Sequence, residues 1–116
     1  MMNDAILAEV FDTLIDFEIV DSEAEFSRDW LGRSESYARG LRFHKTLPSI
    51  ASIAICASKL QHYGRRLAAH GGHERMAERF LELSNACHAQ INARCEATWL
   101  AALEKGPASA QTRAQV

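Results

Sequence analysis

Basic and hydroxyl side chains follow one another closely in the second quarter of the chain. The seven are Arg33, Ser34, Ser36, Tyr37, Arg39, Arg42 and Lys45. Guanidinium, ammonium and hydroxyl groups are the donors that hold the phosphates of a nucleic-acid duplex, with an affinity that falls as salt rises. The pattern therefore predicts a phosphate-binding surface, in which the Tyr37 hydroxyl donates to phosphate while its ring stays in the core.

The charges are unevenly distributed, although the net charge is only −2. Residues 1–30 hold nine acids and one base, residues 31–70 hold one acid, Glu35, and seven bases, and residues 71–116 hold five of each. Such segregation favours a positive face that meets an anionic partner. The alternative is that the acidic first helix packs against the basic segment and cancels its charge, which leaves only a solvated helix face.

The chain before the basic segment predicts two helices. Apolar residues at three- and four-residue steps mark the first, within residues 4–20. Ser22 and Glu25 form a capping box, in which the hydroxyl accepts from the backbone near Glu25 and the carboxylate reaches back to Ser22. The second helix therefore begins directly after Ser22. It is expected to bury Trp30 and to end at Gly32, because glycine adopts a left-handed backbone at little cost.

The basic residues are expected on a third, short helix. Ser34 is predicted to cap its N-terminus, and Tyr37 and Leu41 to face inward, so that the basic side chains lie outside. Gly40 weakens this helix by up to about 1 kcal/mol relative to alanine, which suggests that another group approaches its backbone closely.

Two long helices complete the predicted fold, over residues 49–70 and 73–105. Pro48 marks the start of the first, because proline sits well in the first turn of a helix. The second is longer than a domain of this size needs, so its far end is expected to pack on a second subunit or to fold back. The predicted dimer-interface residues are Phe80, Leu83, Ile91 and Trp99. Residues 106–116 are expected to be a disordered tail.

Length and composition favour one all-α domain. A chain of 116 residues buries one modest core. Two prolines and six glycines are few for the many turns that a many-stranded sheet requires. We predict a five-helix single domain over residues 1–105, with a helix-turn-helix core at 22–60 and two long C-terminal helices.

Four features occur in order between about Leu14 and Leu60. They are the serine-capped second helix, the turn Gly32-Arg33-Ser34, a helix that opens Ser34-Glu35-Ser36-Tyr37, and Leu47-Pro48-Ser49 leading into a helix with Ile50, Ile53, Ala57 and Leu60. In these features the chain resembles the lambda-repressor-like, or Xre-type, helix-turn-helix regulators. The resemblance implies a homodimeric DNA-binding transcriptional regulator whose third helix enters the major groove.

The resemblance also implies where bases would be read, namely at Glu35, Ser36 and Gly40. Glu35 can accept from cytosine N4 but repels phosphates, Ser36 is weakly selective, and Gly40 offers no side chain. Phosphate contacts are therefore expected to dominate over base readout. The alternative function is a helical protein-interaction module, an antiactivator or adaptor with a protein partner, that keeps the scaffold without reading DNA.

Enzymatic and metal-binding functions have little support in the sequence. It has no phosphate-binding glycine loop and no nucleophile with its base at a familiar spacing, so neither an enzyme nor a cofactor is expected. His70, His73, Cys87 and His88 are zinc-ligand types, but the adjacent Cys87 and His88 point to different faces, so no metal is expected.

The sequence predicts a cytoplasmic protein without a membrane contact. The first residues lack the positive charge of a secretory signal, and no run of about 18 apolar residues occurs. The three cysteines, an odd number, indicate reduced thiols. Cys56, Cys87 and Cys95 lie on or beside apolar stripes and are expected to be small core residues.

Overall fold

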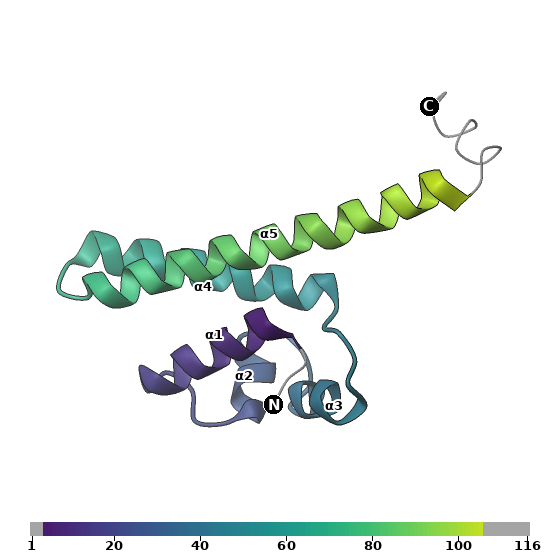
Figure 1. Cartoon of the computed structure of the whole chain (residues 1–116). Helices are drawn as coiled ribbons and strands as arrows, with labels where there is room; N and C mark the ends of the chain where they lie inside the picture. The colour runs from purple at the N-terminus through teal and green to yellow at the C-terminus, as the bar shows by residue number, and fades with distance from the viewer. Residues whose placement is uncertain (1–3, 106–116) are drawn as a thin grey trace.

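The computed structural model describes residues 4–105, which form five helices and no strand (Figure 1). The helices are α1 (Ala5–Asp16), α2 (Glu23–Asp29), α3 (Tyr37–His44), α4 (Ile50–His70) and α5 (Glu74–Lys105). The predicted five-helix, all-α single domain is confirmed. The tail predicted at 106–116 lies outside the described residues.

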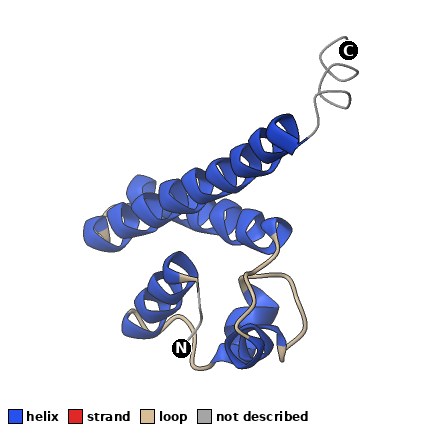
Figure 2. Ribbon diagram, turned by 45° about the vertical axis from the view of Figure 1, so that its right-hand side comes forward, coloured by secondary structure: helices blue, strands red, loops and turns tan. Residues whose placement is uncertain are grey.

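The helices form two layers. α4 and α5 run antiparallel as one layer, and α1, α2 and α3 pack beneath it (Figure 1, Figure 2). The reversal between α4 and α5 is tight because Gly71 and Gly72 both have positive φ, of 82° and 85°. No helix of residues 4–105 is long and apolar enough to span a lipid bilayer.

The core lies between the layers and draws side chains from all five helices. Phe80 of α5 lies near its centre, with its ring edge-on to Phe17 and Trp30 at centroid distances of 6.3 and 6.0 Å. Phe80 and Leu83 are each only 2% exposed. The prediction that these two residues form a dimer interface is therefore corrected, because the chain's own core already covers them.

The end of α5 extends beyond the cover that α4 provides (Figure 1). Ile91 is half-buried against the core, and the Arg94 guanidinium donates to the Pro48 carbonyl at 2.7 Å. All of residues 95–105 are exposed. The thiol of Cys95 is therefore not a core group, contrary to expectation, whereas Cys56 and Cys87 are buried as predicted.

The helix cap predicted at Ser22 is present, and α4 has a cap at Ser49 that was not predicted. The Ser22 hydroxyl accepts from the Glu25 N–H at 3.2 Å, and the Glu25 carboxylate accepts from the Asp21 N–H at 2.6 Å, one residue before the predicted partner. The Ser49 hydroxyl caps α4 by accepting from the Ser52 N–H at 3.1 Å. The helix-turn-helix segment is thus bounded by the sequence signals that predicted it.

The start of α3 differs from the prediction. Ser34 does not cap the helix, which begins at Tyr37, because the Ser34 carbonyl accepts from the Tyr37 N–H and forms a turn there instead. Ser36 occupies the N-cap position with a helical ψ near 0° and makes no side-chain cap bond. An N-cap hydroxyl normally reaches the backbone from an extended residue, so neither serine closes this helix end.

Candidate nucleic-acid interface

α3 is fixed to α2 by one buried serine. The Ser27 hydroxyl donates to the Glu23 carbonyl and accepts from the Ala38 N–H, both at 2.9 Å, and Ser27 is fully buried. The Ala38 N–H lies in the first turn of α3, where no intrahelical acceptor exists. Ser27 therefore sets where α3 begins relative to α2. Gly32, with φ of 64°, takes the left-handed backbone predicted for this turn.

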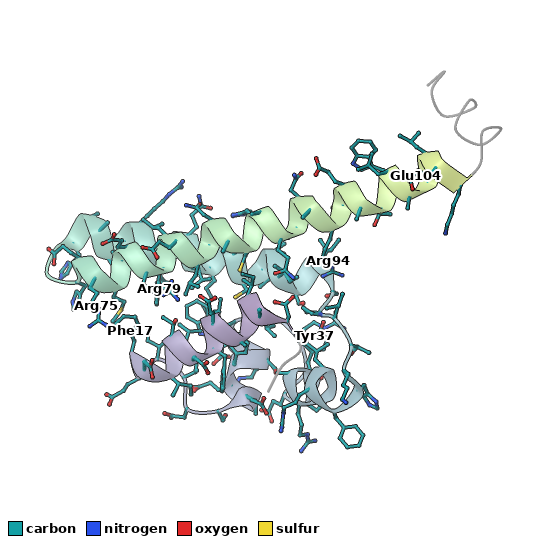
Figure 3. The ribbon with its side chains drawn as sticks, in the orientation of Figure 1. Phe17, Tyr37, Arg75, Arg79, Arg94 and Glu104 are labelled. Carbon is teal, nitrogen blue, oxygen red and sulfur yellow. The ribbon has the colours of Figure 1, made fainter. Side chains whose placement is uncertain are left out.

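α3 is fixed to α4 through Tyr37, which lies between the two helices in Figure 3. The Tyr37 hydroxyl accepts from the Ser49 N–H at 2.9 Å and lies 3.3 Å from the Ser52 hydroxyl. Burial raises the Tyr37 pKa, but the hydrogen bonds from Ser49 and Ser52 outweigh it, and the pKa lies below its ordinary value of 10.0. The hydroxyl is engaged within the chain and is therefore not free to donate to a phosphate, contrary to the prediction.

Every carboxylate of the α2–α3 segment has a partner. Glu23 accepts from Arg42 at 2.9 Å, and Glu35 accepts from Arg28 at 3.0 Å. Arg28 also holds Asp29 through two nitrogens, at 2.9 and 3.2 Å. The pKa of Arg28 is raised first by this bond to Asp29 and then by Glu35, and the pKa of Asp29 is correspondingly lowered. Glu25, the fourth acid, caps the start of α2.

Three predicted phosphate donors remain without a carboxylate partner in residues 4–105. Arg39 and Lys45 are exposed and make no ion pair there, and the Arg33 guanidinium lies 4.7 Å from the centroid of the Tyr37 ring. The Ser34 and Ser36 hydroxyls are exposed beside them, 3.4 Å apart. The surface thus keeps most of the predicted donors, but Arg42 is tied to Glu23.

The acidic helix α1 does not neutralise this surface by direct pairing. Its ion pair in the described part of the chain joins Glu9 to Arg79 of α5 at 2.9 Å, and Arg79 lies on the α5 side of α1 in Figure 3. Arg79 also contacts Glu82 at 3.3 Å. Glu9 of α1 therefore pairs with α5, and within residues 4–105 no acid of α1 forms an ion pair with the basic segment.

The outer face of α3 contains an aromatic residue that the sequence reasoning missed. Phe43 is 80% exposed, one turn beyond Arg39, and Leu47 in the following loop is 60% exposed. A hollow of about 220 Å³ is lined by Ser36, Arg39, Gly40, Phe43 and His44. The sequence contained the information needed to find this residue. Phe43 follows Arg39 by four positions, so the two side chains lie on the same, polar face of the helix. Gly40 has open space where a Cβ would stand, so no group of residues 4–105 makes the predicted close approach to its backbone.

The histidines and cysteines once considered for a metal lie apart. The His70 and His73 rings stack at 6.3 Å beside the α4–α5 turn, whereas Cys87 is buried and His88 is exposed further along α5. Within residues 4–105, no three histidine, cysteine or acidic side chains gather as a metal site would require.

Comparison with known protein families adds an identification. A model described as a family of unknown function, DUF6626, matches residues 7–100, which include all of the helix-turn-helix segment and most of α5. The chain belongs to this family. No curated protein and no solved structure matches the chain significantly. Membership of DUF6626 brings no activity with it, so the resemblance to lambda-repressor-like regulators stays a prediction.

Proposed function

We propose that this DUF6626 protein is a small helix-turn-helix transcriptional regulator that binds duplex DNA mainly through phosphates. The observation that carries the proposal is the charge pairing around α3. All four carboxylates of the α2–α3 segment have partners within the chain, whereas Arg33, Arg39 and Lys45 have no carboxylate partner among residues 4–105. An exposed surplus of cations on one short helix and its flanking loops suits a polyanion.

The amount of base readout in this proposal is small. Glu35 is held by Arg28, Ser36 has only a hydroxyl to offer, and Gly40 has no side chain. Specific recognition normally requires bidentate side chains at such positions. Affinity would therefore depend strongly on salt and weakly on sequence, and the three free thiols agree with action in a reducing cytoplasm.

The first prediction concerns the two unpaired cations. Replacing Arg39 and Lys45 together by alanine is expected to weaken duplex binding at least tenfold, because two phosphate contacts are lost. The slope of log affinity against log salt should fall by about two. Fluorescence anisotropy with a labelled duplex, titrated at several salt concentrations, measures both quantities.

The matched control replaces Arg65 and Arg66, two exposed arginines near the other end of α4, by alanine. It makes the same change in net charge at a distance from α3 and should leave most of the affinity. The proposal fails if the wild-type protein binds no duplex at low salt, or if the two double variants weaken binding equally.

The proposed regulator is a homodimer joined through the free end of α5. Trp99, Leu100 and Leu103 are 53%, 46% and 49% exposed there, at spacings that place them along one side of the helix. Of the residues predicted for the interface, Trp99 belongs to this cluster, and the half-buried Ile91 stays a predicted interface residue. An exposed aromatic and aliphatic cluster is the usual anchor of a subunit interface.

The second prediction is that Leu103→Glu converts the dimer to a monomer, because a carboxylate within the apolar cluster would be desolvated without a partner. Light scattering on a sizing column measures the mass. Leu47→Glu, at a leucine of the α3–α4 loop that is 60% exposed against 49% for Leu103, should leave the mass unchanged. A wild-type mass equal to one chain would contradict the dimer.

A second candidate function is a protein-interaction module, and the observation that favours it is Phe43. A phenylalanine that is 80% exposed beside Arg39 has the composition of a protein-binding hot spot. A protein partner that binds the wild type and is lost on Phe43→Ser, together with an absence of DNA binding, would favour this function over the first.

A further inference from the structure

A second surface of the molecule, separate from the α3 face, is hollowed. A cavity of about 370 Å³ opens between the end of α2, the middle of α4 and the start of α5. Its apolar wall consists of Ile19, Trp30, Tyr63, Leu67, Met76 and Phe80. The cavity lies at the lower end of the range for small-molecule sites, which are typically about 300–1,000 Å³ and mostly apolar with few polar groups.

The polar side of the cavity is formed by Asp29 and Lys59. The Lys59 ammonium donates to the backbone carbonyl of Asp29 at 2.6 Å and lies 4.6 Å from the Trp30 centroid and 6.0 Å from the Tyr63 centroid. The side-chain carboxylate of Asp29 is held by two nitrogens of Arg28. An ammonium has three N–H donors. Only one of them has an acceptor in the described part of the chain.

The cavity therefore joins an apolar wall to a cation with unused donors. A cationic ligand would be repelled by Lys59, and a neutral ligand would leave its donors unused. An anionic head group beside Lys59 would gain charge-assisted hydrogen bonds, while an apolar tail would cover Leu67 and Met76. Lys59 donates to the backbone carbonyl of Asp29 and not to its carboxylate, whose two oxygens accept from Arg28, so the Asp29 side chain does not occupy the remaining Lys59 donors.

We propose that this cavity binds a small amphipathic monocarboxylate, with the carboxylate on Lys59 and the apolar tail along the wall formed by α4 and α5. The proposal rests on the cavity, the unused Lys59 donors and the pairing of Asp29 with Arg28. It does not depend on DNA binding by α3.

The chain contains its own reporter for the test. It has two tryptophans, of which Trp30 lines the cavity and Trp99 lies on the exposed end of α5. In a Trp99→Phe background, emission therefore comes from Trp30 alone. Octanoate, octanol and octylammonium share one tail length and differ in the charge of the head group. Titration with each, below its micelle concentration, should give a saturable change, with octanoate binding about tenfold tighter than octanol.

The ammonium itself is tested by Lys59→Met, which keeps the stem and removes the charge. This variant should bind octanoate about tenfold more weakly, with the affinity for octanol unchanged. Arg65→Met, on another face of α4, removes the same charge outside the cavity and should not change either affinity. Leu67→Phe fills part of the wall and should weaken both octanoate and octanol. Circular dichroism checks that each variant is folded.

Three results would overturn the proposal. One is the absence of a saturable change in Trp30 emission with octanoate. Another is octylammonium or octanol binding as tightly as octanoate, which would show that the head group is not recognised as an anion. The last is an equal loss of octanoate affinity in Lys59→Met and Arg65→Met, which would indicate a general charge effect instead of a contact with Lys59.

Discussion

Replacing Gly64 by valine is expected to lower the free energy of unfolding by about 2–3 kcal/mol. Gly64 lies within α4, and a Cβ added there would stand 2.9 Å from both Cγ and Cδ2 of Leu81 and 3.3 Å from Cβ of Phe80. Carbon atoms in favourable contact are about 3.5–4.0 Å apart. Valine would therefore push α4 and α5 apart along the contact that builds the upper layer.

The matched control is the other glycine inside a helix, Gly40 of α3. Nothing lies within 4 Å of its Cβ position, so Gly40→Ala should raise the free energy of unfolding by about 0.5–1 kcal/mol through helix propensity alone. Urea denaturation followed by circular dichroism measures both variants. Changes of the same sign at the two glycines would contradict this account of the α4–α5 contact.

The sequence predicted those features that depend on residues close together in the chain. The hydroxyl of Ser22 accepts from a backbone N–H three residues away. Gly32 takes its left-handed backbone because it has no side chain, which depends on no other residue. Pro48 marks the start of α4 in the same local way, since the helix begins two residues after it. Five helices and most of their ends could be predicted because each of these signals acts within about one helical turn.

Features that depend on distant residues could not be predicted in the same way. No residue near Gly64 in sequence indicates that Leu81 of α5 lies against it, because the two helices meet only in the folded chain. Phe80 and Trp99 belong to one apolar pattern on α5. Phe80 is buried and Trp99 is exposed because α4 is shorter than α5 and does not reach Trp99. Arg42 pairs with Glu23 nineteen residues earlier, which removed a predicted phosphate donor.

Truncation of Trp30 to alanine is expected to have the largest effect of all, a loss of about 3–5 kcal/mol in the free energy of unfolding. Trp30 is only 4% exposed, directly follows the last residue of α2 and packs against the upper layer. Its ring meets Phe80 edge-on at 6.0 Å and Tyr63 at 6.1 Å, and Lys59 lies over it. Alanine would leave a void where three helices meet, because Phe80 is only 2% exposed and is held by the core.

Phe43→Ala is the matched control, since it also removes an aromatic ring, but one that is 80% exposed. It should change the free energy of unfolding by no more than about 0.5 kcal/mol. Urea denaturation followed by circular dichroism compares the two variants without relying on tryptophan emission. A Trp30→Ala variant as stable as Phe43→Ala would mean that α2 is not anchored through Trp30. Because Ser27 of α2 holds the first turn of α3, the position of the basic surface would then have to be fixed from α4, through Tyr37 and Ser49.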